Sequence, residues 1–559
     1  MKKIWLFFLI ALVVLTVCIL PLGGRPMLTP DETRYAEIPR EMILSGNYVS
    51  PRLNGVRYFE KPAFSYWAFA VSFKIFGMNR FALRLPCMLA MLATAWIVFL
   101  LMGHFYRDPR PRLLGAMVFA AMPFVYVLAT IAITDMFLTL FVTGASASFF
   151  LAAQDNTGRR KRVLLLLLCG LCCGLAFLTK GFLAFAVPVV TLVPYLIWDR
   201  KWKKTFTLPW IPLVVLLLTA APWCFAIHRQ EPDFWHYFFF EEHINRFFGQ
   251  EKAQHARSFF YFFPFMACAL AIWALMIPNL CRAWRGQVKN SPLLKFCICG
   301  VVLPFLLLSC SSGKLPTYIL PCLPPMAILI AVGSEKFFVE ERRDKAFHLT
   351  LLVLAVLLPL TLVLVTINML TGFPDILFMK EDWPQLLLLA VVSAMCLTGM
   401  FLSWKETDRY GKLFLFLIAV LPALFAANFV FPVRMKEWQA PNLFLAEVAG
   451  ELPRENTIIV TYRRPFQDVC WAFRTTEVRM LIKQNEISYG ISYPEEKHRF
   501  IPDFPALKGL CREQKAKNGH VAVVTPLSRL SEFEKAMPQP ERVWKSYPGL
   551  KTGYAVLLY

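Results

Sequence analysis

Adjacent carboxylates near the N-terminus are the first residues in this sequence that could do chemistry. Asp31 and Glu32 follow Thr29 and Pro30, and paired acids suit general base catalysis or the binding of a cationic sugar. Thr29, with Glu32 three positions later, also matches a helix-capping box with Pro30 at the first helical position. Capping would account for Thr29 and Glu32 and leave Asp31 free to point elsewhere, so both interpretations stay open at this stage.

A second group of polar residues lies just before an apolar stretch. Tyr58, Glu60 and Lys61 precede residues 63–77, a stretch that is too short to cross a bilayer. We expect it to lie in the membrane interface, which places Lys61 near the lipid headgroups. A lysine at that depth either extends its amine to water or binds a lipid phosphate.

Two more polar positions lie at the ends of predicted membrane spans. Asp135 begins an apolar run, where its charge either favours the helix N-terminus or serves a function, since carboxylates near a bilayer core are costly. Tyr318 and Lys314 offer hydrogen-bond donors at the entry to a later span, where Pro316 and Pro321 could equally serve packing alone.

The loop 228–258 combines histidines with a cation that suits phosphate. Four of the eight histidines lie here, His243 among them. Their spacing fits no standard zinc pattern, and a solvated loop position is the alternative for each. Arg246 lies among aromatic residues, and a guanidinium binds phosphate oxygens through a planar fork of donors. Arg246 is therefore the better phosphate candidate in this loop.

The composition indicates what must position these residues. The chain has 559 residues, of which 57% are hydrophobic and only 17% charged, with a mean hydropathy of +0.52. Soluble proteins have about 25% charged residues, so a soluble, disordered or fibrous protein is excluded. The net charge of +22 is explained by basic cytoplasmic loops of a membrane protein, and nucleic acid is not needed as a partner.

The hydropathy pattern predicts thirteen membrane spans. They run near 4–21, 83–103, 113–130, 135–153, 163–179, 181–198, 208–227, 259–280, 294–311, 317–335, 347–369, 384–403 and 411–431. Short basic segments, such as 107–112 and 159–162, all fall on one side if every span is real, and the positive-inside rule makes that side the cytoplasm. One missed span would invert half of the pattern, so the agreement supports the count.

The opposite side carries the long segments 22–82, 228–258 and 432–559, together with all of the candidate residues. We expect this to be the periplasmic side of a bacterial inner membrane. The first apolar run follows two lysines and also matches a signal peptide. No small-residue cleavage site follows it, which favours an uncleaved span and a cytoplasmic N-terminus.

The region after the last span alternates strand-like and helical patterns. Strands are expected at 457–462, 520–525 and 553–558, and helices at about 441–451, 503–517 and 526–536. The predicted fold is therefore a polytopic α-helical membrane domain, 1–431, followed by a small periplasmic α/β domain, 432–559. Cys470 and Cys511 are the only cysteines of the second domain, and a disulfide between them is compatible with an oxidising compartment.

The sequence has no P-loop, no GxGxxG after a strand, no HExxH and no GxSxG. An active site that faces outward has no cytosolic nucleotide available. It must take an activated group from another source, such as a lipid phosphate in the membrane.

These motifs closely resemble those of the bacterial aminoarabinose transferases, whose first periplasmic loop is similar to the run PDETRYAEIPREMILSGNYVSPRLNGVRYFEKPAFSYW. The enzymes of this family are 4-amino-4-deoxy-L-arabinose lipid A transferases, relatives of the protein O-mannosyltransferases within the C-type glycosyltransferase superfold. The resemblance continues through Thr134-Asp135, His243-x-x-Arg246 and KLPTYILP, and extends over essentially the whole chain. It is less specific for the sugar than for the wider family.

The resemblance and the motifs together give the candidate site. Asp31, Asp135 and Glu32 are the catalytic candidates; Lys61, Arg246, Tyr58, Tyr318 and Arg34 are the candidates for the donor phosphate; Glu60 and His243 are the candidates for a divalent metal such as zinc, which some relatives bind.

The implied reaction moves aminoarabinose from undecaprenyl phosphate to a lipid A phosphate, which lowers the charge of lipid A and gives resistance to polymyxin and other cationic peptides. A phosphate acceptor is already ionised, so Asp31 would orient it or stabilise the sugar cation; for a hydroxyl acceptor Asp31 would be the base. The alternatives are transfer of another sugar or to another acceptor, as in protein O-mannosylation, and a lipid flippase.

Overall fold

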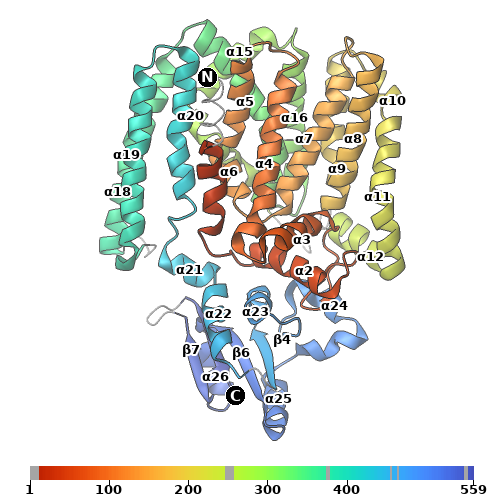
Figure 1. Cartoon of the computed structure of the whole chain (residues 1–559), viewed down its shortest axis with the longest axis vertical. Helices are drawn as coiled ribbons and strands as arrows, with labels where there is room; N and C mark the ends of the chain where they lie inside the picture. Colours follow the sequence, from red (N-terminus) through yellow and green to blue (C-terminus); the bar gives the residue numbers. More distant parts are fainter. Residues whose placement is uncertain (1–11, 246–256, 373–377, 454–455, 463–464, 547–551) are drawn as a thin grey trace.

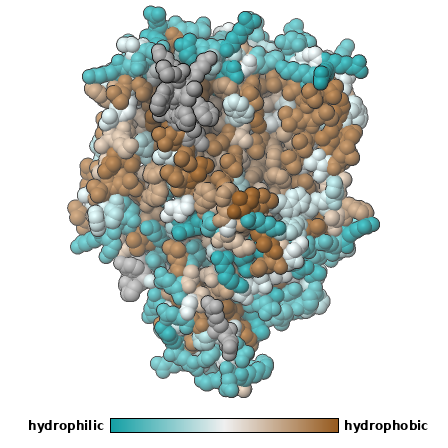
Figure 2. All heavy atoms as spheres, viewed as in Figure 1, coloured by the Kyte–Doolittle hydropathy of each residue, from teal (hydrophilic) through white to brown (hydrophobic). Residues whose placement is uncertain are grey.

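The computed structural model describes residues 12–245, 257–372, 378–453, 456–462, 465–546 and 552–559. Within these residues, nine helices are long and apolar enough to cross a membrane, or ten if one bent pair counts as a single span. They form a bundle with an apolar middle band and hydrophilic ends, as Figure 2 shows. The nine are α4 (Arg80–Met102), α7 (Thr134–Ala152), α8 (Arg159–Lys180), α10 with α11 (Lys204–Gln230), α16 (Pro292–Cys310), α17 with its flanking turns (Pro316–Glu340), α18 (Lys345–Thr371), α19 with the preceding turn (Lys380–Lys405) and α20 (Arg409–Ala426).

Three predicted spans differ from single long helices. The span 113–130 is α5 (Pro109–Ala120) and α6 (Pro123–Ala129), bent by 64°, because Pro123 cannot donate the backbone hydrogen bond that would continue α5. The span 181–198 is the 16-residue α9 (Leu183–Trp198). The span 259–280 is divided into short helices, α14 (Phe263–Ala269) and α15 (Ile277–Gln287) among them. The predicted first span, 4–21, lies partly outside the described residues, so the count of thirteen stays a prediction.

Two short helices lie across the end of the bundle that carries the candidate residues (Figure 1). They are α2 (Asp31–Ser45) and α3 (Phe64–Phe76), joined by the hairpin of β1 (Arg52–Leu53) and β2 (Val56–Arg57). The short α12 (Phe234–His236) lies at the same end. The predicted capping box is wrong: Pro30 is the residue before α2, and no side chain caps this helix.

The C-terminal region forms the predicted α/β structure. Its six-stranded sheet has the order β5-β4-β3-β6-β8-β7, parallel from β5 to β6 and antiparallel at β8 and β7. The strands are β3 (Thr457–Tyr462), β4 (Arg479–Leu481), β5 (Phe500–Ile501), β6 (His520–Pro526), β7 (Arg542–Lys545) and β8 (Tyr554–Leu558). The helices are α21 (Val433–Gln439), α22 (Asn442–Glu451), α23 (Phe466–Phe473), α24 (Ser488–Ile491), α25 (Phe504–Ala516) and α26 (Leu530–Ala536). The three predicted strands and the helices α22, α25 and α26 are confirmed, within a few residues at their ends.

One face of this sheet shares a hydrophobic core with the membrane bundle. Along β6, Ala522 and Val524 belong to the large cluster that also contains the membrane helices, whereas Val521 and Val523 belong to a separate cluster, because side chains alternate along a strand. Cys470 and Cys511 lie in these two different clusters and are free thiols, so the two residues form no disulfide in this structure.

Candidate active site

A cavity of about 420 Å³ opens at the end of the bundle nearest α2 and α3. Residues before α3, at the end of α8, at the start of α9, from 239–244 and around the end of α16 line it. These residues are Glu60, Lys61, Lys180, Phe182, Leu183, Ala186, Phe239, Glu242, Ile244, Leu307, Leu308, Ser311, Gly313 and Tyr318. The cavity is thus lined by both charged and aliphatic side chains, as a site for a charged headgroup on a long hydrocarbon chain requires.

Two lysines place positive charge in this cavity. Lys61 forms an ion pair with Glu242 and donates to the Glu60 carbonyl oxygen at 2.9 Å. Lys180 lies 2.5 Å from Asp135 Oδ1, and its amine is 4.1 Å from the centre of the Tyr318 ring. All four charged side chains of the two pairs are at least 90% buried. A buried charge needs a partner, and each of these lysines has a carboxylate. An anion that enters the cavity would compete with Glu242 for Lys61 and with Asp135 for Lys180.

Asp31 differs from these buried groups because its side chain is 57% exposed. Arg34 lies 3.6 Å from Asp31, but its strongest contact is with Glu486 in the C-terminal region, at 2.6 and 3.1 Å. Arg34 is not among the residues that line the cavity, so its role as a phosphate ligand stays a prediction. Asp31 is open to a reacting group, as a catalytic or sugar-binding carboxylate must be.

Tyrosines connect the two acidic positions. Tyr35 is buried beside Thr134 and interacts electrostatically with both Asp31 and Asp135. The Tyr58 hydroxyl is buried, and among the described residues it has no hydrogen-bond partner. Burial raises the pKa of Tyr58 well above its usual range, so this hydroxyl stays protonated at neutral pH, with its hydrogen-bonding capacity unused among the described residues.

Glu32, like Asp31 and Asp135, does not line the cavity, but it differs from Asp31 in having no exposed surface, which argues against its prediction as a catalytic residue. Its carboxylate is fully buried and accepts from Arg84 at 2.7 and 2.9 Å and from Arg25 at 2.8 Å. It also accepts backbone hydrogen bonds from Leu28 and from Ala132, three residues before Asp135. With every acceptor position in use and no route to a substrate, Glu32 has a structural role: it holds the segments that carry Asp31 and Asp135.

Two predicted residues lie where the structure gives no contacts. Arg246 is outside the described residues, and the side chain of His243 is not described. Within the described part of the chain, no group of three or more His, Cys, Asp and Glu side chains could hold a metal ion. Glu60 lines the cavity, but the described residues around it do not form a zinc site.

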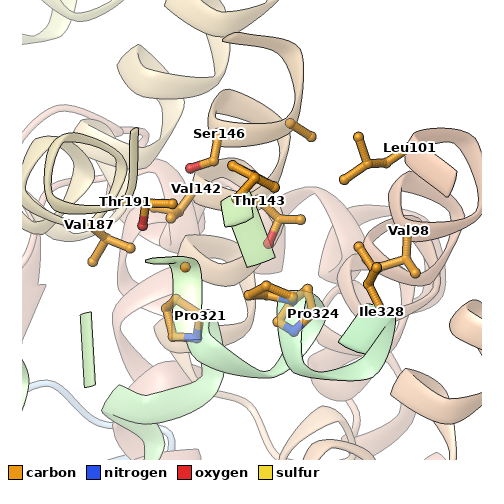
Figure 3. A pocket seen from close by; sticks show the side chains of 14 residues that line it. Val98, Leu101, Val142, Thr143, Ser146, Val187, Thr191, Pro321, Pro324 and Ile328 are labelled. Carbon is orange, nitrogen blue, oxygen red and sulfur yellow. The ribbon is translucent and has the colours of Figure 1, made fainter. Parts of the chain in front are cut away.

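Two other hollows do not suit an anionic substrate. A void of about 30 Å³ lies among α4, α7, α9, α16 and α17. Aliphatic and proline side chains line it, together with Phe296 and the hydroxyls of Thr143, Ser146 and Thr191 (Figure 3). It contains no charged group. A groove of about 770 Å³ beside α26, β7 and β8 contains one acid, Glu534, and one base, Lys545, and lies in the C-terminal domain away from the motifs.

Sequence reasoning missed three residues of this site. Lys180, at the last position of α8, and Glu242, next to His243, give the paired charges of the cavity, and Glu486 holds Arg34. A lysine at the outer end of an apolar span was a usable signal for Lys180. Glu486 gave none, since it lies 452 residues from its partner in the chain.

The comparisons with known proteins agree with this geometry. Residues 3–238 match the family of dolichyl-phosphate-mannose-protein mannosyltransferases, and residues 436–548 match the arabinosyl transferase ArnT C-terminal domain. An undecaprenyl phosphate-alpha-4-amino-4-deoxy-L-arabinose arabinosyl transferase from Shewanella sediminis is 33% identical, covering 97% of this chain and 96% of the relative. Its counterpart from Erwinia tasmaniensis is 35% identical, covering 94% of each chain. The crystal structure of ArnT from Cupriavidus metallidurans bound to undecaprenyl phosphate has a TM-score of 0.83 at 22% identity, covering 99% of this chain and 98% of that one.

A bundle of membrane helices with a cavity of charged and apolar side chains at one end, joined to an α/β domain, is the architecture of a multi-pass membrane glycosyltransferase of the C type. The chain belongs to the family of undecaprenyl phosphate-alpha-4-amino-4-deoxy-L-arabinose arabinosyl transferases, to whose members it is similar over nearly its whole length. This membership favours an enzyme over the alternative of a lipid flippase.

Proposed function

We propose that the protein transfers 4-amino-4-deoxy-L-arabinose from undecaprenyl phosphate to a phosphate of lipid A, at the periplasmic face of the bacterial inner membrane. The names of its relatives support the donor, undecaprenyl phosphate-linked aminoarabinose, and the lipid A acceptor is what the family resemblance implies. Adding an amino sugar to lipid A reduces its negative charge, so cells with the enzyme should resist polymyxin and other cationic peptides.

The cavity with Lys61 and Lys180 is the observation that carries the proposal. Its cations suit the phosphate of a polyprenyl donor, because an ammonium in a water-poor site attracts phosphate more strongly than it does in water. Its aliphatic and aromatic residues, such as Leu183, Leu308 and Phe239, suit the first units of the prenyl chain. A soluble sugar nucleotide would gain nothing from that apolar surface.

The reaction breaks one bond to the anomeric carbon and forms another. The bond between C1 of the sugar and the donor phosphate oxygen breaks, undecaprenyl phosphate leaves, and a lipid A phosphate oxygen bonds to C1. By analogy with glycoside hydrolysis, the sugar passes through an oxocarbenium-like state. Lys61 stabilises the charge that develops on the leaving phosphate, an electrostatic contribution that is commonly the largest. We assign a second such cation to Arg246.

The acceptor determines what the carboxylates must do. The second ionisation of a phosphate monoester has a pKa near 6, so an acceptor phosphate needs no strong base at neutral pH. Asp31, which is exposed, would then stabilise the positive sugar or hold its ammonium group. Asp135, paired with Lys180, would fix that lysine beside Tyr318.

The charge distribution supports the proposed orientation. The basic segments around α10 and α15 lie at the end of the bundle away from the C-terminal domain (Figure 1). The positive-inside rule assigns that end to the cytoplasm. The cavity and the C-terminal domain would then face the periplasm, where both lipid substrates are accessible.

The test is transfer by the purified full chain in detergent, with undecaprenyl phosphate aminoarabinose and lipid A as substrates. The expected product is lipid A that is heavier by one aminopentose residue. Lys61→Ala should lower kcat/KM by roughly 10²- to 10³-fold, as removal of a transition-state donor does. Lys517→Ala is the matched control, because Lys517 is 64% exposed in the C-terminal domain, and it should leave the rate within about twofold.

Two results would contradict the proposal. One is transfer of mannose to a protein hydroxyl with no product on lipid A, which would favour the protein O-mannosyltransferase alternative. The other is equal activity of Lys61→Ala and Lys517→Ala, which would show that Lys61 and the cavity take no part in the reaction.

A further inference from the structure

Asp468 is a buried carboxylate that none of the chemistry above uses. It lies in α23 of the C-terminal domain and is fully buried. Among the described residues no lysine, arginine or histidine forms an ion pair with it. Burial raises the pKa of Asp468 to about 7. A buried acid without a cation is costly, so its hydrogen-bond partners indicate what it does.

Those partners lie at the start of α2. The Thr29 hydroxyl is 2.8 Å from both carboxylate oxygens of Asp468, and the Thr33 hydroxyl is 3.3 Å from one of them. Asp31 lies midway between these two threonines in the sequence. The carboxylate of Asp468 therefore bridges both sides of the turn from which the exposed Asp31 projects.

Other residues of the C-terminal region hold the same turn. Asn442 donates to Asp468 at 3.1 Å and to the Met27 carbonyl oxygen at 2.9 Å. The Thr29 amide donates to the Gln439 carbonyl oxygen at 2.7 Å. The segment 27–33 is thus held by residues that follow it by more than 400 positions, and the shared hydrophobic core places them there.

A second chain of contacts starts from the neighbour of Asp468. Gln467 donates to Glu486, which binds Arg34, and Arg34 lies 3.6 Å from Asp31. Two adjacent residues of α23 therefore reach the surroundings of Asp31 by separate routes. Glu32 anchors the same turn from the membrane side, so the turn is fixed on both sides while Asp31 stays accessible.

We propose that Asp468 is a positioning residue for the transfer reaction: through Thr29 and Thr33 it fixes the first turn of α2 and so the place of Asp31. The proposal rests on the proposed function, in which Asp31 acts on the sugar. If Asp468 acts in this way, the C-terminal domain contributes to the active site by fixing the position of Asp31, and Asp468 itself does not contact the substrate. Preorganised sites need such support, because a displacement of about 1 Å can reduce a rate about 100-fold.

The experiment compares Asp468→Asn with the wild-type full chain by hydrogen exchange and by steady-state kinetics. Asparagine keeps the size of the side chain but loses one acceptor. The amides of Glu32 and Arg34, which donate to Leu28 and Pro30, should exchange roughly tenfold faster, while those of α16 stay unchanged. The kcat should fall at least about tenfold, and KM for the lipid-linked donor should change little, because the donor phosphate binds at Lys61.

Two further variants keep the test decisive. Thr29→Val removes one donor and should give the same two changes at smaller size, even if Asp468→Asn folds poorly. Asp503→Asn is the matched control: Asp503 is an exposed acid of the same domain that accepts from the Ala506 amide at 2.8 Å. It should change neither exchange at 27–35 nor kcat.

Unchanged exchange at residues 27–35 in both Asp468→Asn and Thr29→Val would overturn the proposal. So would faster exchange with an unaltered kcat, because the turn would then be held without consequence for the reaction. If the wild-type chain transfers no aminoarabinose, the proposed function fails instead, and the exchange data still decide whether Asp468 fixes this turn.

Discussion

Replacing Glu32 by glutamine separates two adjacent carboxylates that the sequence alone treats alike. In the wild type the Glu32 carboxylate is fully buried between Arg25 and Arg84. Glutamine has almost the same shape but no charge, so two buried guanidinium groups would lose their anion. Asp31, the next residue towards the N-terminus, is 57% exposed, and Asp31→Asn leaves no buried group without its partner.

The size of the Glu32 effect follows from the electrostatics. Burial opposes the charge of Glu32, but Arg25 and Arg84 outweigh it and hold the pKa of Glu32 at about 2, compared with 4.5 for an ordinary glutamate. That difference corresponds to about 3 kcal/mol of stability at pH 7. Breaking a buried ion pair by removing one partner costs about 3–5 kcal/mol in other proteins, so we expect a loss of about 3 kcal/mol.

Denaturant unfolding of the purified protein in detergent measures this loss, and a transfer assay on the folded fraction gives the activity. Because the pKa of Glu32 is lowered, its stabilisation is present above about pH 4.5 and is lost as the pH falls towards 2. The gap between wild type and Glu32→Gln should therefore narrow in acid. Asp31→Asn should keep wild-type stability within about 0.5 kcal/mol and lose most of the transfer activity. If the Glu32→Gln protein were as stable as the wild type but inactive, the reasoning would be refuted, and Glu32 would be a catalytic residue.

Two other predictions concern charge inside the fold. Lys180→Met should reduce transfer at least about tenfold, because it removes a cavity cation and leaves Asp135 buried without its partner; Lys180→Arg should recover part of the rate, and equal rates for both variants would count against a charge effect. Burial, and then the nearby Glu37, raise the pKa of Glu41 to about 8. A raised carboxylate pKa means that stability is greatest in acid and falls as the pH rises from about 4 to 8. Unfolding midpoints between pH 5 and 8 should show this slope, and Glu41→Gln should flatten it.

Much of the architecture could be predicted because its signals are local. A run of about 20 apolar residues has only one way to satisfy its backbone in lipid, and the predicted spans from 83–103 onward contain helix. The alternating patterns that predicted β3, β6 and β8 reflect one buried face each. The short strands β4, β5 and β7 were missed, because two to four residues carry no period and become strands only through their neighbours in the sheet.

The candidate site could be predicted in part. Lys61, Glu60 and Tyr318 line the cavity, whereas Asp31, Asp135 and Tyr58 were also expected at the site and are not among its lining residues. The family resemblance supplied the reaction. The partners of these residues could not be read from the sequence, because Glu242 follows Lys61 by 181 positions and ion pairing at that separation depends on how helices pack.

Asp31 and Glu32 show most clearly what the sequence could not determine. By itself it determined that two acids begin a segment outside a membrane bundle, because composition and hydropathy are properties of the chain. Successive residues of a helix point about 100° apart, so only one of the pair could face the arginines from other segments. Only the tertiary structure, which brought Arg84 and Asp468 to this turn from distant parts of the chain, decided that Glu32 is anchored in the interior while Asp31 stays open to a substrate.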